Sequence, residues 1–303
     1  MTLRRYGLVL TLALVVALAL LAWFLPSNED FRTENPSWNG SGDFSSLVSA
    51  SPLGSLTDLP TVPAGTGLVL VPYLEFSQSE LAALESYVSG GGSLFLADDY
   101  GFGNQVLNHL GLELRFSGVA LLDPLASYKN QQLPRLARLT EGPLTAGLEI
   151  LVLNNATSLT GAVDEDVLAW SSSFSFLDIN DNDAWDEGEA VGPLPVISVH
   201  RLGEGRVIAV ADPSLFINGM ASLYDNLGFI QNVAAMAPVG LYLDQSHLPP
   251  SSLHQTKDLL TDLRDFIVTP GGTVALVIVF LIVTPLLTWP PGKNRKDTER
   301  RPL

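Results

Sequence analysis

The stretch GLVLVPYLEFSQSELAALESYVSGGGSLFLAD, residues 67–98, decides the fold class. Its two ends, 67–73 and 93–98, are short apolar runs of the kind that form buried strands. Between them Ser77 and Glu80 form a capping-box pattern that predicts the start of a helix, and the Gly-Gly-Gly run predicts its end. Strand, crossover helix and strand make up the parallel-sheet unit, so this stretch predicts an α/β domain.

Further helices and strands are expected after residue 98. Helices are expected over residues 104–110 and 225–236. Strands are expected at LEILVLN (148–154), VLAWSSSFSFLD (167–178), PVISVHRLGEGRVIAVAD (195–212) and GLYLD (240–244). Because the 195–212 stretch turns at Gly-Glu-Gly, it predicts a hairpin of antiparallel strands. We therefore expect a mostly parallel sheet with additional antiparallel strands.

Two uncharged apolar runs lie near the two ends of the chain, and each is long enough to cross the hydrocarbon core of a bilayer. Residues 1–27 are expected to form an N-terminal transmembrane anchor and residues 266–291 a C-terminal transmembrane helix. A cleaved signal peptide is the alternative for the first run. Basic residues beside the runs predict that both termini are cytoplasmic; they are Arg4, Arg5, Lys293, Arg295, Lys296, Arg300 and Arg301.

This reading divides the rest of the chain into four parts. A polar linker (28–43) leads to the main domain (44–247), which is followed by a juxtamembrane linker (248–265) and, after the second span, a basic cytoplasmic tail (292–303). The expected location is the cell membrane, with two spans and the main domain outside the cytoplasm. The membrane and other envelope proteins are the expected partners.

Composition excludes two classes of function. The formal net charge is −16, and such an acidic chain repels phosphate backbones, so no nucleic-acid partner is expected. The chain has no cysteine, which excludes disulfides, thiolate metal sites and a cysteine nucleophile.

Acidic side chains follow several of the expected strands. Ligands of open α/β sheets bind beyond the carboxyl ends of the strands, and the ligand-binding candidates there are Asp98, Asp99, Asp212, Asn218, Asp225, Asn226 and His247. If the strands adjoin, these groups could converge on a cation or a basic group. Structural caps are the alternative, because Asp212 precedes a proline and Asp225 precedes a helix.

The stretch DINDNDAWDEGE, residues 178–189, has the spacing of a calcium loop. The candidate ligands are Asp178, Asn180, Asn182, Asp186 and Glu189. Calcium takes 6–8 oxygen ligands, which this spacing could wrap around it. The expected flanks are strands, and the sixth place holds Asp183 where an EF-hand has glycine. Calcium is therefore the one cofactor under consideration, with a solvated acidic turn as the alternative.

The order of motifs resembles the domain-of-unknown-function 4350 family. The resemblance covers most of residues 40–247 and rests on VLVPYLEFSQSELAALESYVSGGGSLFLADD, GPLTAGLEILVLNNATSL and RLGEGRVIAVADPSLFINGMASLYDNLGFIQN. It implies a fold like that of class I glutamine amidotransferases (flavodoxin-like), held in prokaryotic membranes by flanking helices. It also implies partners in a MoxR-associated or ABC-transporter-associated complex. The family lends no catalytic residues, and the missing cysteine closes the amidotransferase mechanism.

Two functions are therefore expected. The first is a non-catalytic, membrane-anchored, extracytoplasmic binding or scaffold protein of the prokaryotic envelope. The alternative is a metal-dependent hydrolase that uses the carboxylates at the carboxyl ends of the sheet strands.

Overall fold

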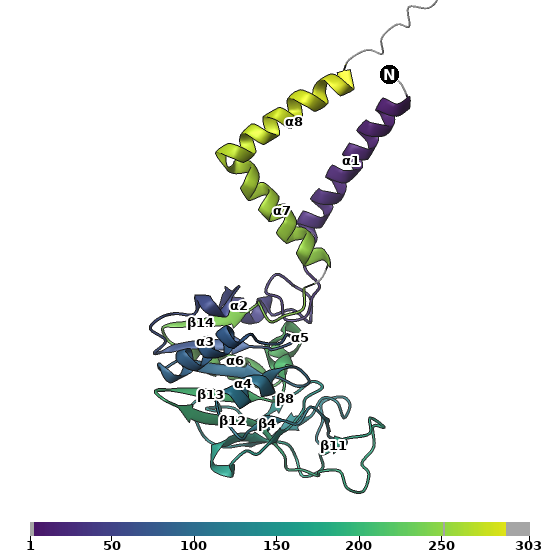
Figure 1. The fold of residues 1–303 in the computed structure, drawn as a ribbon. Coiled ribbons are helices and arrows are strands. Elements are labelled where there is room, and N and C mark those ends of the chain that lie inside the picture. The colour runs from purple at the N-terminus through teal and green to yellow at the C-terminus, as the bar shows by residue number, and fades with distance from the viewer. Residues whose placement is uncertain (1–2, 251, 289–303) are drawn as a thin grey trace, which may run out of the picture. The chain divides into compact units, whose positions relative to one another are not determined.

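A computed structural model describes residues 3–250 and 252–288 (Figure 1). The chain divides into two compact units. One unit is a domain of residues 26–249, and the other contains the described helices at the two ends of the chain. The basic tail (292–303) lies outside the described residues.

The domain is built on an eight-stranded sheet. Its strand order is β1 (Ser51–Leu53), β14 (Gly240–Asp244), β2 (Thr66–Leu70), β3 (Ser93–Ala97), β13 (Gly205–Val210), β12 (Pro195–Leu202), β10 (Val167–Trp170) and β7 (Arg138–Leu139). Neighbouring strands are parallel from β1 to β13 and antiparallel from β13 to β7. A mostly parallel sheet was expected, and the structure corrects this to a mixed sheet in which four pairs of neighbouring strands are parallel and three are antiparallel.

The parallel part of the sheet contains the stretch that decides the fold class. All five residues of β2 and all five of β3 are buried, as expected for strands covered on both faces. Between them runs helix α3 (Gln78–Ser89), and the predicted capping box is confirmed: Ser77 Oγ accepts from the Glu80 N–H and Glu80 accepts from the Ser77 N–H. The predicted strand, helix and strand unit is confirmed.

The other helices and short strands complete the domain. The remaining helices are α2 (Gly42–Val48), α4 (Gly103–His109), α5 (Asn218–Ala221) and α6 (Asn226–Ala235), with 3-10 turns η1 (Leu56–Asp58), η2 (Asp164–Asp166) and η3 (Pro213–Phe216). Three two-stranded sheets pair β4 (Arg115–Phe116) with β9 (Leu159–Thr160), β5 (Ala120–Leu122) with β11 (Phe176–Asp178), and β6 (Arg135–Leu136) with β8 (Leu151–Val152).

Two expected strands are shorter than predicted. Of residues 148–154, only β8 is a strand, and it lies outside the main sheet. The expected strand over 167–178 is split into β10 and β11 by a serine-rich turn. There the Ser175 hydroxyl donates to Ser171 Oγ and to the Ser172 carbonyl. Serine side chains compete with sheet hydrogen bonds in this way, which is why the strand breaks.

Residues 28–43 differ from the predicted linker because they are packed into the domain. The Arg32 side chain is buried and donates to the carbonyl oxygens of Gln245, Leu248 and Pro249. Asn35 is fully buried. A polar composition suggested an exposed chain, but Arg32 binds backbone groups that are distant in sequence, and Asn35 binds Glu29 and Asn39 within the segment.

The second unit contains α1 (Leu3–Phe24), α7 (Ser252–Val268) and α8 (Pro270–Thr288). Within the described residues, no single helix has both the length and the apolar character needed to span a membrane. Val9–Phe24 of α1 is a shorter apolar helix, and α7 with α8 meets the test only as a pair bent by 94°. The predicted flanking transmembrane helices at 1–27 and 266–291 are therefore corrected. Most of the expected linker at 248–265 is part of α7.

Candidate functional site

The strand-end carboxylates Asp98, Asp99 and Asp212 lie on adjacent strands. Asp98 and Asp99 follow β3, and Asp212 follows β13, which pairs with β3 in parallel. All three side chains are buried. The sequence-based expectation that carboxylates gather at this edge of the sheet therefore holds for these three residues.

Burial changes the acidity of this cluster. It raises the pKa of Asp98 to about 6 and that of Asp212 to about 7, because the charged form loses its hydration. The negative charge of Asp99 contributes to both increases, and burial raises the pKa of Asp99 itself. Burial and the nearby carboxylates also raise the pKa of Tyr73, which follows β2. The edge is therefore a place where negative charge is costly.

The Asp98 carboxylate is bound by backbone N–H groups. It accepts from Gly101 and Gly103, both at 2.7 Å, and Gly103 is the first residue of α4. A Cβ atom on Gly101 or Gly103 would lie 2.7 or 2.6 Å from an Asp98 oxygen. Glycine is thus needed at both places for the backbone to approach so closely. Asp98 acts as a structural cap for this turn.

Asp212 is bound in the same manner. Its Oδ1 accepts from the Ser214 N–H at 2.7 Å, which makes Asp212 the N-cap of η3 with Pro213 in the first position. Its Oδ2 accepts from the Asn154 N–H at 2.8 Å. The predicted cap is confirmed, and its second oxygen joins β13 to a loop that is distant in sequence.

Three other predicted ligand-binding residues, Asn218, Asp225 and Asn226, lie outside this carboxylate cluster, and their side chains bind backbone groups. Asn218 accepts from the Asp43 N–H and donates to the carbonyls of Asn35 and Ser37. Asp225 accepts from the N–H groups of residues 149 and 150 and makes no side-chain cap on α6, so the predicted cap there is wrong.

Asn226 is fully buried at the start of α6. Its Oδ1 accepts from the Val152 N–H at 3.0 Å, and its Nδ2 donates to the Val152 carbonyl at 2.9 Å and to the Met220 carbonyl at 3.0 Å. The amide therefore completes the backbone pairing of β8. This role is structural, because every polar atom of the side chain is engaged by backbone.

His247 belongs to a second polar cluster that follows β14. Its Nδ1 lies 3.0 Å from Asp244 Oδ2, its Nε2 lies 3.7 Å from Glu80 Oε1, and its ring stacks on Phe76 with centroids 4.1 Å apart. The sequence analysis missed Glu80 and Phe76 as partners, because only the tertiary fold brings the start of α3 to this place. His247 is a buried packing residue.

The acidic loop 178–189 follows β11 and projects from the domain (Figure 1). Asp178 accepts from the N–H groups of Asn182 and Asp183, and Glu189 accepts from those of Ile179 and Asp186. The amides of Asn180 and Asn182 donate to Asp186, which lowers its pKa. Asp183 has a φ of 60°, the left-handed conformation that the sixth place of a calcium loop requires.

No metal site is identified in the loop or elsewhere among residues 3–250 and 252–288: no three His, Asp or Glu side chains are placed to hold an ion. The carboxylates of the loop bind mainly the N–H groups of the loop itself. Calcium binding therefore remains a prediction of the sequence.

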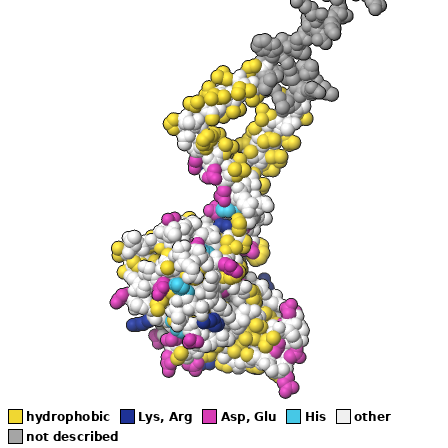
Figure 2. All heavy atoms as spheres, viewed as in Figure 1, with side chains coloured by type: hydrophobic (Ala, Val, Ile, Leu, Met, Phe, Trp, Pro, Cys, Tyr) yellow, Lys and Arg dark blue, Asp and Glu magenta, His cyan; other side chains and the backbone are white. Residues whose placement is uncertain are grey.

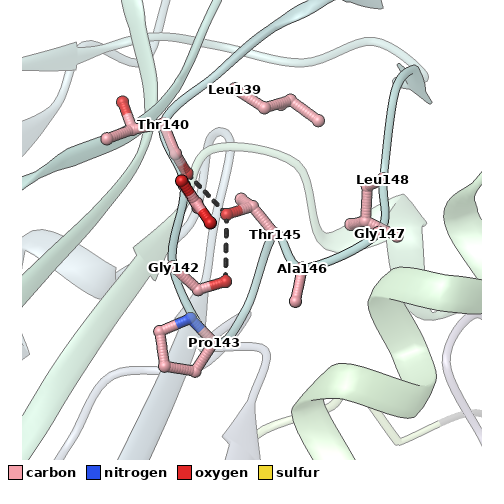
Figure 3. A pocket seen from close by; sticks show the side chains of 9 residues that line it. Leu139, Thr140, Gly142, Pro143, Thr145, Ala146, Gly147 and Leu148 are labelled. Atoms are coloured by element: carbon pink, nitrogen blue, oxygen red, sulfur yellow. Dashed lines mark hydrogen bonds between the residues drawn. The ribbon is translucent and has the colours of Figure 1, made fainter.

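One hollow is lined by a single segment, residues 139–148, and has a volume of about 540 Å³ (Figure 3). Thr145 points across it, and its hydroxyl donates to the Thr140 carbonyl at 2.5 Å and to the Gly142 carbonyl at 3.3 Å. None of the predicted site residues lines it. It contains no group suited to acid/base or metal chemistry apart from Glu141.

A hollow of about 450 Å³ lies beside the acidic loop. Its apolar lining comes from Pro124, Phe174, Phe176, Trp185 and Val191, and its polar lining includes Gln131 and Asp183. The sequence analysis did not identify this surface. The exposure of Phe174 and its position near Trp185 follow from the tertiary structure.

Comparison with known proteins gives one family. The model described as "Domain of unknown function (DUF4350)" matches residues 33–234 of the chain, which is about two thirds of its length. The family resemblance seen in the sequence is confirmed. A search of curated proteins finds no match. The expected likeness to glutamine amidotransferases stays a prediction.

Several solved structures share a weak likeness with the chain. The mmIFT52 N-terminal domain is 14% identical over 55% of this chain and 75% of that chain, with a TM-score of 0.42. A beta-galactosidase from Bacillus circulans sp. alkalophilus is 13% identical over 58% and 23%, with a TM-score of 0.36. A cytoplasmic protein from Salmonella typhimurium LT2 is 15% identical over 65% and 76%, with a TM-score of 0.34. At TM-scores below 0.5 these likenesses support no conclusion about function.

Proposed function

The chain belongs to the DUF4350 family, and from this premise we propose that residues 26–249 form a binding or scaffold domain that performs no reaction of its own. The family description names no activity. Support for the proposal comes from what the polar side chains of the domain contact.

The observation that carries this proposal is that the strand-end carboxylates of Asp98 and Asp212 bind backbone N–H groups. Asp98 and Asp212 are both buried, and each accepts two backbone N–H groups. A general acid or base must lie within hydrogen-bond reach of a substrate proton. These two carboxylates instead hold the turns at the starts of α4 and η3, so their positions are explained by folding alone.

The alternative function is a metal-dependent hydrolase centred on the same residues. In its favour, the raised pKa values of Asp98 and Asp212 resemble those of groups in reaction centres. Against it, the described residues contain no three His, Asp or Glu side chains placed to hold a metal ion. Burial without an ion also explains the raised values, since it disfavours the charged form.

Site-directed photo-crosslinking in cells of the source organism tests the binding proposal. A benzophenone amino acid would replace one exposed residue at a time, at Trp38, Val62, Val163, Phe174 or Val239. A partner protein should be captured from neighbouring positions on one surface and not from the others. Capture from no position would contradict the proposal.

A hydrolysis assay tests the alternative. The purified full chain would be offered p-nitrophenyl acetate and p-nitrophenyl phosphate, with and without Mg²⁺, Mn²⁺ or Zn²⁺. We expect no rate above that of buffer. A metal-dependent rate that is lost in Asp99→Asn would favour the hydrolase. Asp99 suits this test because its carboxylate accepts from the adjacent Tyr100 N–H, so the change should leave contacts between distant segments intact.

A further inference from the structure

The hollow beside the acidic loop presents apolar side chains to solvent. Phe174, Trp185 and Val191 have relative exposures of 56%, 52% and 51%, while Phe176 is buried beneath them. We call these four residues with Pro124 the aromatic surface. Isolated exposed apolar residues are common, but a hollow lined by several of them marks an interaction site.

The aromatic surface is held in place by strand pairing and side-chain hydrogen bonds. Phe176 lies in β11, which pairs with β5, and also forms a bridge with Val191. On the opposite side, Gln131 Nε2 donates to the Asp183 carbonyl at 2.9 Å, and Gln132 Nε2 donates to Asp183 Oδ1 at 3.0 Å. A binding surface that is fixed before it meets a partner loses less conformational entropy on binding.

The loop beside this surface carries charge of one sign. Residues 178–189 contain six acidic residues and no basic residue, and Asp181, Asp183, Asp186 and Glu187 are exposed. Figure 2 shows acidic side chains at the tip of the lobe that carries β11 and hydrophobic side chains on the face beside it. Such a surface attracts positive charge and repels negative charge.

We propose that the aromatic surface and its acidic rim bind a basic segment of a partner protein, in which Lys or Arg side chains flank an aromatic or leucine anchor. The anchor would occupy the hollow between Phe174 and Trp185. The flanking cations would lie against the rim and over the aromatic rings, which attract cations through their faces. This inference rests on the proposed binding function and names the class of its partner.

Three peptides of equal length test the chemistry of recognition. Fluorescein-labelled KLKWKLK, ELEWELE and KSKSKSK would be titrated with the purified full chain in low salt and EDTA. We expect KLKWKLK to bind at least about tenfold more tightly than either of the others, and its binding to weaken between 50 mM and 500 mM NaCl. Equal or tighter binding of ELEWELE would overturn the proposal.

Substitutions locate the binding. Trp185→Ala and Phe174→Ala should each weaken KLKWKLK at least about tenfold, as expected for aromatic anchors. Asp181→Asn combined with Glu187→Gln should reduce the dependence on salt. Trp38→Ala is the matched control because Trp38 is also exposed, at 68%, and lies outside the lining of the hollow. Equal affinities of Trp185→Ala and Trp38→Ala would overturn the proposal.

Titration with a neutral sugar tests whether the hollow binds a carbohydrate instead of a basic segment. Aromatic rings beside amides also suit carbohydrate rings, so maltohexaose would be titrated under the same conditions. Binding of the sugar that is lost in Trp185→Ala, without binding of KLKWKLK, would replace the basic segment by a carbohydrate.

The crosslinking experiment separates this inference from the proposed function. Capture at Phe174 of a protein whose crosslinked segment is rich in Lys or Arg would support both. Capture only at Trp38, Val62 or Val239 would leave the binding function standing and overturn the present inference. Capture nowhere would remove the function on which the inference rests.

Discussion

The Oδ2 atom of Asp212 lies 2.8 Å from the backbone nitrogen of Asn154 and accepts its hydrogen bond. This contact joins the end of the central strand β13 to the loop that follows β8. It uses an oxygen that a catalytic carboxylate would need for substrate. The contact also places an acidic group in a fully buried position, with measurable consequences for stability.

The raised pKa of Asp212 leads us to expect that the free energy of unfolding of the domain depends on pH. The pKa of this carboxyl is raised from 3.8 to about 7 on folding, so between these values the folded chain holds a proton that the unfolded chain has released. The stabilisation is fully present below pH 3.8 and is lost as the pH rises through 7, by at most about 1.4 kcal/mol per pH unit for one proton. Asp98 and Asp99 act in the same direction.

Urea unfolding from pH 4 to 8 measures this effect. We expect Asp212→Asn to make the free energy of unfolding depend less on pH, because its amide does not titrate. Asp58→Asn, at an exposed position, is the control and should keep the wild-type slope. Identical slopes for all three proteins would show that Asp212 does not titrate in this range.

Asn226→Ala should destabilise the domain strongly. The change leaves the Val152 N–H and carbonyl, and the Met220 carbonyl, without the partners that the buried amide supplies. Leaving buried polar groups unpaired costs about 1–3 kcal/mol each, and we expect a total loss of roughly 2–4 kcal/mol. Gln231→Ala, at an exposed position of the same helix, should change the free energy of unfolding by less than about 0.5 kcal/mol. Similar losses in both variants would contradict this role.

Arg32 tests whether residues 28–43 belong to the folded domain. Its guanidinium donates to three carbonyls near the end of the domain and to Glu29. We expect Arg32→Ala to lower the free energy of unfolding by roughly 2–4 kcal/mol. Arg32→Lys should restore little, because one ammonium group cannot reproduce the planar set of donors. A wild-type urea curve for Arg32→Ala would show that this segment is a linker after all.

We expect the Asp178 carboxylate to stabilise the conformation of the acidic loop. It is buried and accepts two N–H groups of the loop, so Asp178→Asn should cost about 1–2 kcal/mol in EDTA. Asp181→Asn is the matched control at an exposed place where asparagine accepts the positive φ of 58°. Equal melting temperatures for the two variants would contradict the role of Asp178.

Melting temperatures of the wild type and Asp178→Asn, measured with and without calcium, test the predicted calcium binding. If the loop binds calcium, millimolar calcium should raise the wild-type melting temperature saturably and raise that of Asp178→Asn less. Superimposable melting curves with and without calcium would contradict calcium binding.

Local patterns predicted the centre of the sheet, from β2 and β3 to the antiparallel pair β12 and β13. The capping box at Ser77 and Glu80, the apolar runs of β2 and β3 and the hairpin of β12 and β13 are read from residues close together in sequence. Each of these features is fixed by short-range hydrogen bonding or by burial of a continuous apolar run. For the same reason, the gathering of Asp98, Asp99 and Asp212 could be expected, since parallel neighbours end at one edge of the sheet.

The sequence by itself determined the family, the α/β character of the domain and the absence of thiol chemistry. Only the tertiary structure decided that Asp225 and Asn226 bind the segment at 149–152 and that Arg32 holds residues 28–43 to the end of the domain. The described helix boundaries decided that no single helix is both long and apolar enough to span a membrane. The tertiary structure also brought Phe174 and Trp185 together beside an acidic loop. These relations depend on contacts between distant residues, and on which polar atoms remain unpaired after the chain folds, so a pattern along the sequence does not contain them.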